Sequence, residues 1–159
     1  MTDPERVARA FATHGAFERD DEGFDVRTTA LDATVQVDES DRRVVVTVRV
    51  PTIDAVVAGE TVAPVVQEGW FETFERRLED VGGVTVLDPG EPRVSMDERE
   101  AQVVVKTSLP AERASVVVED AKAVVDYVEG TFAEGIIPGY TYREPAAGLV
   151  ERARSAGER

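Results

Sequence analysis

The sequence feature that most constrains the fold is a segment that occurs twice. Residues 35–51 (VQVDESDRRVVVTVRVP) and residues 94–110 (VSMDEREAQVVVKTSLP) align at a constant offset of 59 without a gap. Seven of the 17 aligned positions are identical. We interpret the match as an internal duplication. The alternative is two valine-rich hairpins that came to resemble each other independently.

Each copy predicts a β-hairpin. Apolar residues alternate with polar ones in both second strands, and the alternation keeps the same parity after the shift of 59. Such a pattern is typical of an antiparallel sheet with one covered face and one wetter face. The apolar positions on the covered side are Val44, Val46, Val48 and Val50 in the first copy, and Val103, Val105, Thr107 and Leu109 in the second. The acidic segments 38–41 and 97–100 then form the hairpin turns.

A helix is predicted after each hairpin, because apolar residues recur at helical spacing there. The first stripe is Val66, Trp70, Phe74, Leu78 and Val81, and the second is Val117, Ala121, Val124, Val128 and Phe132. A further strand is predicted before each hairpin, at residues 24–29 and 84–87. The repeated unit is therefore βββα, and its two copies span about 24–81 and 84–133.

We predict an α+β fold for a single domain of residues 1–159. A mostly antiparallel sheet of about six strands comes from the duplicated unit, and the helices pack on one face. An extra N-terminal helix begins at Asp3, and the C-terminal extension, residues 134–159, holds an extra helix that begins near Glu144 and Pro145.

The composition indicates a salty environment. The chain carries 32 acidic and 18 basic residues, a net charge of −14, and only two lysines. Such an acidic surface is what a cytoplasm at molar salt would select, and at about 1 M ionic strength the Debye length of about 3 Å prevents long-range steering of partners. With no signal peptide and no long apolar run, we expect a halophilic, cytoplasmic protein without a membrane partner.

The sequence offers no motif for catalysis. One histidine and no cysteine exclude zinc sites built on imidazole and thiolate, and the acidic run 18–25 lacks the spacing of a calcium loop. Motifs for a nucleophile or a phosphate-binding loop are missing as well. Arginines alternate with acids, which argues against nucleic-acid binding. We therefore predict no catalytic residue, metal or cofactor, and lean away from an enzyme.

One segment departs from the acidic background. Residues 130–150 (GTFAEGIIPGYTYREPAAGLV) contain only two acids and one arginine, and tyrosine and arginine beside apolar anchors are enriched at binding hot spots. The candidate binding residues are Phe132, Ile136, Ile137, Tyr140, Tyr142 and Arg143. The alternative is that this segment wraps the core.

These observations predict a non-enzymatic binding, chaperone-like or scaffold domain that contacts a protein partner or a second copy of itself. The alternative function is a small-molecule-binding domain or enzyme with a pocket near Tyr140, Tyr142 and Arg143.

The chain also resembles a known family. Through GWFETFERRLEDV, VVEDAKAVVDYVEGTF and GIIPGYTYREPAAGL, it is identified as a member of an uncharacterised family of small haloarchaeal proteins, a membership that implies no known activity. The order of its elements is also similar to the type III secretion chaperone-like fold, whose members are dimeric binding proteins. That second resemblance concerns architecture alone.

Overall fold

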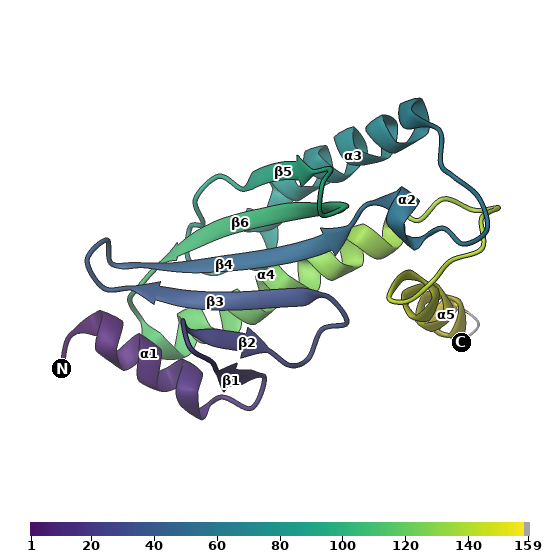
Figure 1. The fold of residues 1–159 in the computed structure, drawn as a ribbon. Helices are drawn as coiled ribbons and strands as arrows, with labels where there is room; N and C mark the ends of the chain where they lie inside the picture. Colours follow the sequence, from purple (N-terminus) through teal and green to yellow (C-terminus); the bar gives the residue numbers. More distant parts are fainter. Residues whose placement is uncertain (158–159) are drawn as a thin grey trace.

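The computed structural model describes residues 1–157 and has an α+β fold with one open, six-stranded antiparallel sheet (Figure 1). The strands are β1 (Phe17–Arg19), β2 (Phe24–Val26), β3 (Asp32–Asp38), β4 (Arg43–Pro51), β5 (Arg93–Asp97) and β6 (Gln102–Pro110), in the spatial order β1-β2-β3-β4-β6-β5. The helices are α1 (Asp3–Thr13), α2 (Ile53–Val56), α3 (Pro64–Leu78), α4 (Ala114–Glu134) and α5 (Ala146–Gly157), with a 3-10 segment η1 (Glu79–Val84). The predicted fold class, with its added terminal helices, is confirmed.

The two predicted hairpins meet at the centre of the sheet, where β4 and β6 form nine antiparallel residue pairs. Thr47 lies opposite Lys106, and these two positions are themselves 59 residues apart. A shift of 59 consequently converts the pair Val44 and Leu109 into the pair Val103 and Val50, which the register also contains. The hairpins β3–β4 and β5–β6 are thus related by a local two-fold axis through the pair Thr47 and Lys106. Duplication of a single ancestral hairpin would produce this register.

The turns of the two hairpins share their backbone geometry. Arg42 and Ala101, again 59 apart, have positive φ angles of 54° and 52°. Each turn is held by the first aspartate of its acidic segment: the Asp38 carboxylate accepts the N–H of Asp41 at 3.0 Å, and the Asp97 carboxylate accepts that of Arg99 at 3.1 Å. The Asp41 N–H, followed by the Ser40 hydroxyl, lowers the pKa of Asp38. The recurrence of the acids in both copies therefore has a structural reason.

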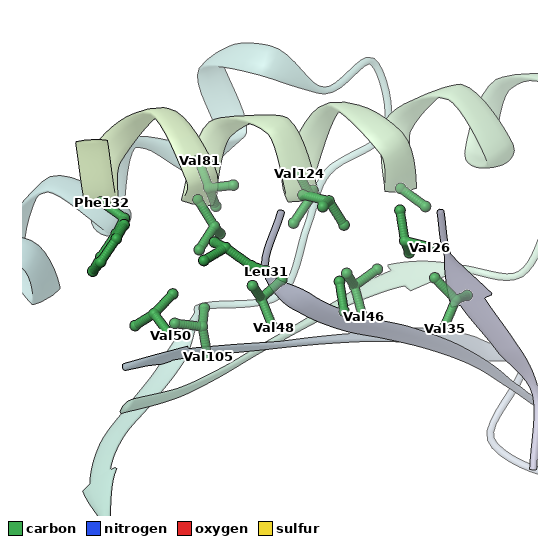
Figure 2. Close-up of a cluster of buried hydrophobic side chains, with 14 of the residues drawn as sticks. Val26, Leu31, Val35, Val46, Val48, Val50, Val81, Val105, Val124 and Phe132 are labelled. Carbon is green, nitrogen blue, oxygen red and sulfur yellow. The ribbon is translucent and has the colours of Figure 1, made fainter. Parts of the chain in front are cut away.

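The core lies between the sheet and α4. Val46, Val48 and Val50 of β4 face Val124 and Phe132 of α4 (Figure 2), and all five are 1% exposed or less. Fully burying such a side chain contributes about 1.5–3 kcal/mol. Helix α1 covers the same face beside α4, with Val7 and Phe11 buried; Phe11 packs against Phe17 and Phe24 at ring distances of 4.8 and 5.6 Å.

The first predicted unit, residues 24–81, contains the three strands β2, β3 and β4, whereas the second, residues 84–133, contains only β5 and β6. The prediction of a βββα unit is therefore wrong for the second copy. Residues 84–87 form no strand. The buried Asp120 carboxylate of α4 accepts the N–H groups of Val86 and Leu87 at 2.9 and 2.8 Å, which ties this segment to the helix. Strand β1, which was not predicted, is too short to show an alternating pattern.

The strand predicted at 24–29 is shorter than expected and ends at Val26. The acidic run before it forms a hairpin turn between β1 and β2, in which the Asp20 carboxylate accepts the N–H groups of Glu22 and Gly23 at 2.9 and 2.7 Å. A Cβ atom at Gly23 would lie 2.3 Å from the carbonyl oxygen of Val35. Only glycine therefore fits at this turn.

The helix after the first hairpin does not mirror the helix after the second. Whereas α4 crosses the sheet, α3 packs against α4, η1 and the short helix α2. Among the described residues, no helix is long and apolar enough to cross a membrane.

We predict that Asp120→Ala lowers the free energy of unfolding by about 2–4 kcal/mol, because two N–H groups would lose their charged acceptor in the interior. Chemical denaturation measures the change. The matched control is Asp126→Ala on the same helix, which removes an i,i+4 ion pair with Lys122 and is expected to cost about 0.5 kcal/mol or less. Equal losses for the two variants would contradict the role assigned to Asp120.

We also predict that Arg42→Gly and Ala101→Gly each raise the free energy of unfolding by about 0.5–1 kcal/mol, because glycine adopts positive φ without steric cost. The two gains should agree and add, since they relieve the same backbone conformation in separate turns. Ala123→Gly, within α4, is the control and should cost about 1 kcal/mol. A loss of stability at either turn would show that the strain is absent there.

Candidate functional site

The charge-poor segment, residues 130–150, contains the last turns of α4, an irregular stretch and the start of α5. Helix α4 ends where the Gly135 N–H reaches back to the carbonyl of Thr131 at 3.1 Å. The stretch then passes α3 and reaches α2 before Ala146 and Leu149, both buried, anchor α5. The segment thus joins α4 to α5 and contacts α3 and α2 on the way, and the six predicted residues fall into two groups along it.

The first group lies beside α3. Phe132 is fully buried and packs edge-on against Trp70 with ring centroids 6.3 Å apart, while Trp70 stacks on Phe74 at 5.7 Å. Ile136 and Ile137 are partly buried against the same core. Phe132 therefore supports the surface from below, and the two isoleucines help to form it.

A hollow of about 310 Å³ separates α3 from residues 134–138. We call it the α3 groove. Its lining residues are Gly69, Trp70, Thr73, Phe74 and Arg77 from α3, and Glu134, Gly135, Ile136, Ile137 and Pro138 from the segment. The floor is apolar, whereas Arg77 and Glu134 place one charge of each sign at its walls.

Trp70 brings an unusual polar group to the α3 groove. Its indole N–H is buried and has no hydrogen-bond partner within the described chain, although buried indole N–H groups usually find one. A Cβ atom at Gly135 would lie 3.4 Å from this nitrogen. The end of α4 therefore lies within van der Waals range of the indole nitrogen.

The second group lies away from the groove, on α2. Tyr142 pairs with Val57 in an isolated antiparallel bridge, and the Arg143 N–H donates to the Val56 carbonyl at 2.7 Å. The Tyr142 hydroxyl donates to the Ile137 carbonyl, and Tyr140 packs edge-on against Tyr142 at 6.3 Å. Tyr140, Tyr142 and Arg143 do not line the α3 groove. They act as a strap that fixes the path of the segment.

Sequence reasoning missed the contribution of α3. Trp70 was predicted as core, which its 5% exposure supports, but it also lines the groove. The neighbouring stripe Gly69, Thr73 and Arg77 repeats every four residues next to the buried stripe of Trp70, Phe74 and Leu78. That spacing was available in the sequence, yet nothing local indicates which segment the stripe faces.

The lone histidine has a structural place. His14 follows α1, where its Nε2 lies 2.8 Å from a Glu119 carboxylate oxygen and its Nδ1 accepts the Ala16 N–H at 3.1 Å. Because Nδ1 accepts, the ring proton sits on Nε2 and is donated to Glu119. Both ring nitrogens are thereby used, Nε2 to join the end of α1 to α4 and Nδ1 to hold the turn that leads to β1.

The fold and the groove together define an α+β domain with one helix-covered sheet face and a surface groove beside α3. Residues 12–152 match the family described as "Family of unknown function (DUF5813)". The chain belongs to this family.

Among solved structures, the chain is similar to one described as "Structure of the HopA1-SchA Chaperone-Effector Complex", with 12% sequence identity and a TM-score of 0.45. The match covers 79% of this chain and 87% of the other. The similarity is one of architecture, as expected from the order of the elements. No curated protein matches the chain.

The partly buried phenol of Tyr142 gives a pH-dependent prediction, because desolvation raises its pKa. An acid whose pKa is higher in the folded protein contributes stability below its unfolded pKa, about 10, and loses that contribution as the pH rises through the folded value. We expect Tyr142→Phe to cost about 1 kcal/mol at neutral pH through the lost hydrogen bond. The deficit should shrink above about pH 10.

Denaturant titrations of wild type and Tyr142→Phe across this range would measure the effect. Tyr140→Phe keeps the ring packed edge-on and is the control, expected to change stability by less than about 0.5 kcal/mol. A deficit for Tyr142→Phe that does not depend on pH would contradict the assignment.

Proposed function

We propose that this protein is a non-enzymatic binding domain that holds an apolar segment of a protein partner in the α3 groove. The observation that carries the proposal is the groove itself, with an apolar floor and an unbonded indole N–H beneath Gly135. Its volume of about 310 Å³ is at the lower end for small-molecule sites, which suits a few inserted side chains. In this proposal the indole N–H donates to a carbonyl of the bound partner segment.

The amino-acid composition supports this mode of recognition. We infer that the protein works in the cytoplasm of a halophile, where salt screens long-range attraction. Apolar burial is not screened, and strongly hydrated salts strengthen it. Five of the ten residues that line the groove come from residues 130–150, where acids are rarest, and the lining contains one carboxylate, Glu134. A partner that buries apolar side chains against the apolar floor therefore has a single carboxylate to leave hydrated, which matters because burying a carboxylate is costly.

The strap has a supporting role in the proposal. Tyr142 holds the carbonyl of Ile137, and Ile137 lines the groove. Tyr140, Tyr142 and Arg143 therefore set the position of the groove wall from α2. This arrangement favours a protein contact over the alternative of a small-molecule pocket formed by these three side chains.

Two exposed positions on α3 allow a direct test. Thr73 lines the α3 groove, whereas Val65 lies near the start of the helix, outside the groove and 75% exposed. We expect Thr73→Glu to release a partner that co-purifies with the wild type in high salt, and Val65→Glu to retain it. Both substitutions add the same charge to the same helix, so a general effect of charge would affect both variants.

A photo-crosslinking residue at position 73, compared with one at position 65, would identify what occupies the groove. A partner peptide crosslinked only from position 73 supports the proposal, and a crosslink to the same chain would make a second copy the occupant. The proposal is wrong if Thr73→Glu retains every partner, or if both positions crosslink the same proteins.

A further inference from the structure

The sheet face opposite α4 carries an unexpected distribution of charge. In Figure 1 this face lies toward the viewer, with α4 behind it. On β1, β2 and β3 its charged residues are all acidic: Glu18, Asp25, Asp32 and Asp38. On β4, β6 and β5 it carries four cations, Arg43, Arg49, Lys106 and Arg93, and one acid, Asp97. A chain with a net charge of −14 thus gathers cations on one half of its uncovered sheet face.

Two of these cations are direct neighbours. Arg93 and Lys106 lie opposite each other in the pairing of β5 with β6, and both are exposed. Neither takes part in an ion pair with any carboxylate of residues 1–157. Like charges at directly opposed positions destabilise a sheet. One of only two lysines in the chain is therefore placed where it opposes folding unless an anion lies between the two side chains.

The same two side chains line a hollow of about 460 Å³, which we call the sheet hollow. Its floor and walls come from β4, β6 and the loop before β5, and the lining residues are Val45, Gly90, Glu91, Pro92, Arg93, Lys106, Thr107 and Ser108. This volume lies within the range of small-ligand sites, about 300–1,000 Å³.

Gly90 shapes the wall of the sheet hollow. Its N–H donates to the Ser108 carbonyl at 2.8 Å, which holds the loop against β6. A Cβ atom at this position would lie 2.8 Å from the Ser108 hydroxyl, so a larger residue would displace that hydroxyl.

A third cation stands beside the sheet hollow in a fixed position. The Arg43 guanidinium donates to the Ser108 hydroxyl at 2.9 and 3.3 Å from two of its nitrogens. Its Nη2 would lie 3.6 Å from a Cβ atom at Gly90. Because hydrogen bonds orient the guanidinium in advance, less entropy is lost when a ligand binds.

We propose that the sheet hollow is a binding site for a small, multiply charged anion that bears phosphate or carboxylate groups. Arg93, Lys106 and Arg43 supply three positive charges, and the one acidic residue in the lining, Glu91, leaves a net charge of +2. Arginine binds such oxyanions through paired N–H groups, and lysine binds them as a point charge. The ligand relieves the repulsion between Arg93 and Lys106. This site is separate from the α3 groove and does not depend on the proposed function.

The chain offers a matched pair of lysines for the test. Lys106→Gln removes a charge from the sheet hollow, and Lys122→Gln removes the same charge from α4, where the side chain pairs with Asp126 at 2.7 Å. Pyrophosphate and citrate, titrated at about 1 M KCl so that the net charge of the chain is screened, represent the phosphate and carboxylate chemistries. Backbone amide shifts of Gly90, Arg93 and Lys106 in NMR spectra report binding.

The expected result is saturable binding of at least one of the two anions to the wild type and to Lys122→Gln. For Lys106→Gln we expect binding about tenfold weaker, as the loss of one charge-assisted hydrogen bond implies. The tighter of the two anions then defines the ligand chemistry. Failure of both anions to bind the wild type would overturn the proposal, and so would equal affinity in the two variants.

A charge reversal separates binding from stability. Lys106→Glu places an acid opposite Arg93, so it should raise the melting temperature without ligand and abolish the further rise that the bound anion gives to the wild type. A merely structural role for Lys106 predicts that stability falls when the lysine is replaced. An unchanged ligand-induced rise in Lys106→Glu would also overturn the proposal.

Discussion

The antiparallel pairing of β4 with β6 is the interaction on which the rest of the structure depends. It joins the two hairpins over nine residue pairs, and it places the buried valines of both strands on one face. Helix α4 follows β6 directly and packs across that face. The same register fixes what lies on the opposite face, since side chains alternate along a strand. The core and the sheet hollow are therefore set by one alignment of two strands.

The predictable parts of the fold were those with a local signal. The valine alternation of β4 and β6 and the apolar stripe of α4 extend over nine residues or more, and both identify their buried face correctly. Residues 84–87 have the composition of a strand, but a side chain 33 positions away, Asp120, takes their N–H groups. The local sequence does not indicate that these N–H groups bind a side chain instead of a neighbouring strand. Strand β1 is held by tertiary contacts as well, since it pairs with β2 and its Phe17 packs on Phe11.

Prediction of the candidate sites shows the same limit. The scarcity of charge in residues 130–150 was visible in the sequence, and the structure divides that segment between the α3 groove and the strap on α2. The wall that α3 contributes to the groove could not be predicted, because a stripe of residues on a helix does not show which segment of the chain it faces. The cations of the sheet hollow come from separate parts of the sequence, since Arg43 lies 50 positions before Arg93 and 63 before Lys106. They become neighbours only through the strand order β4-β6-β5.

The local two-fold axis has a consequence for how the sheet is assembled. A single hairpin of this kind would leave its nine-residue strand as an open edge, with a row of unpaired backbone groups available to any other strand. It could close that edge only by meeting another hairpin in solution, at a rate set by protein concentration. With both hairpins in one chain, the encounter becomes intramolecular, and its rate no longer depends on protein concentration. The edge is then closed at any dilution, and each chain completes its own sheet.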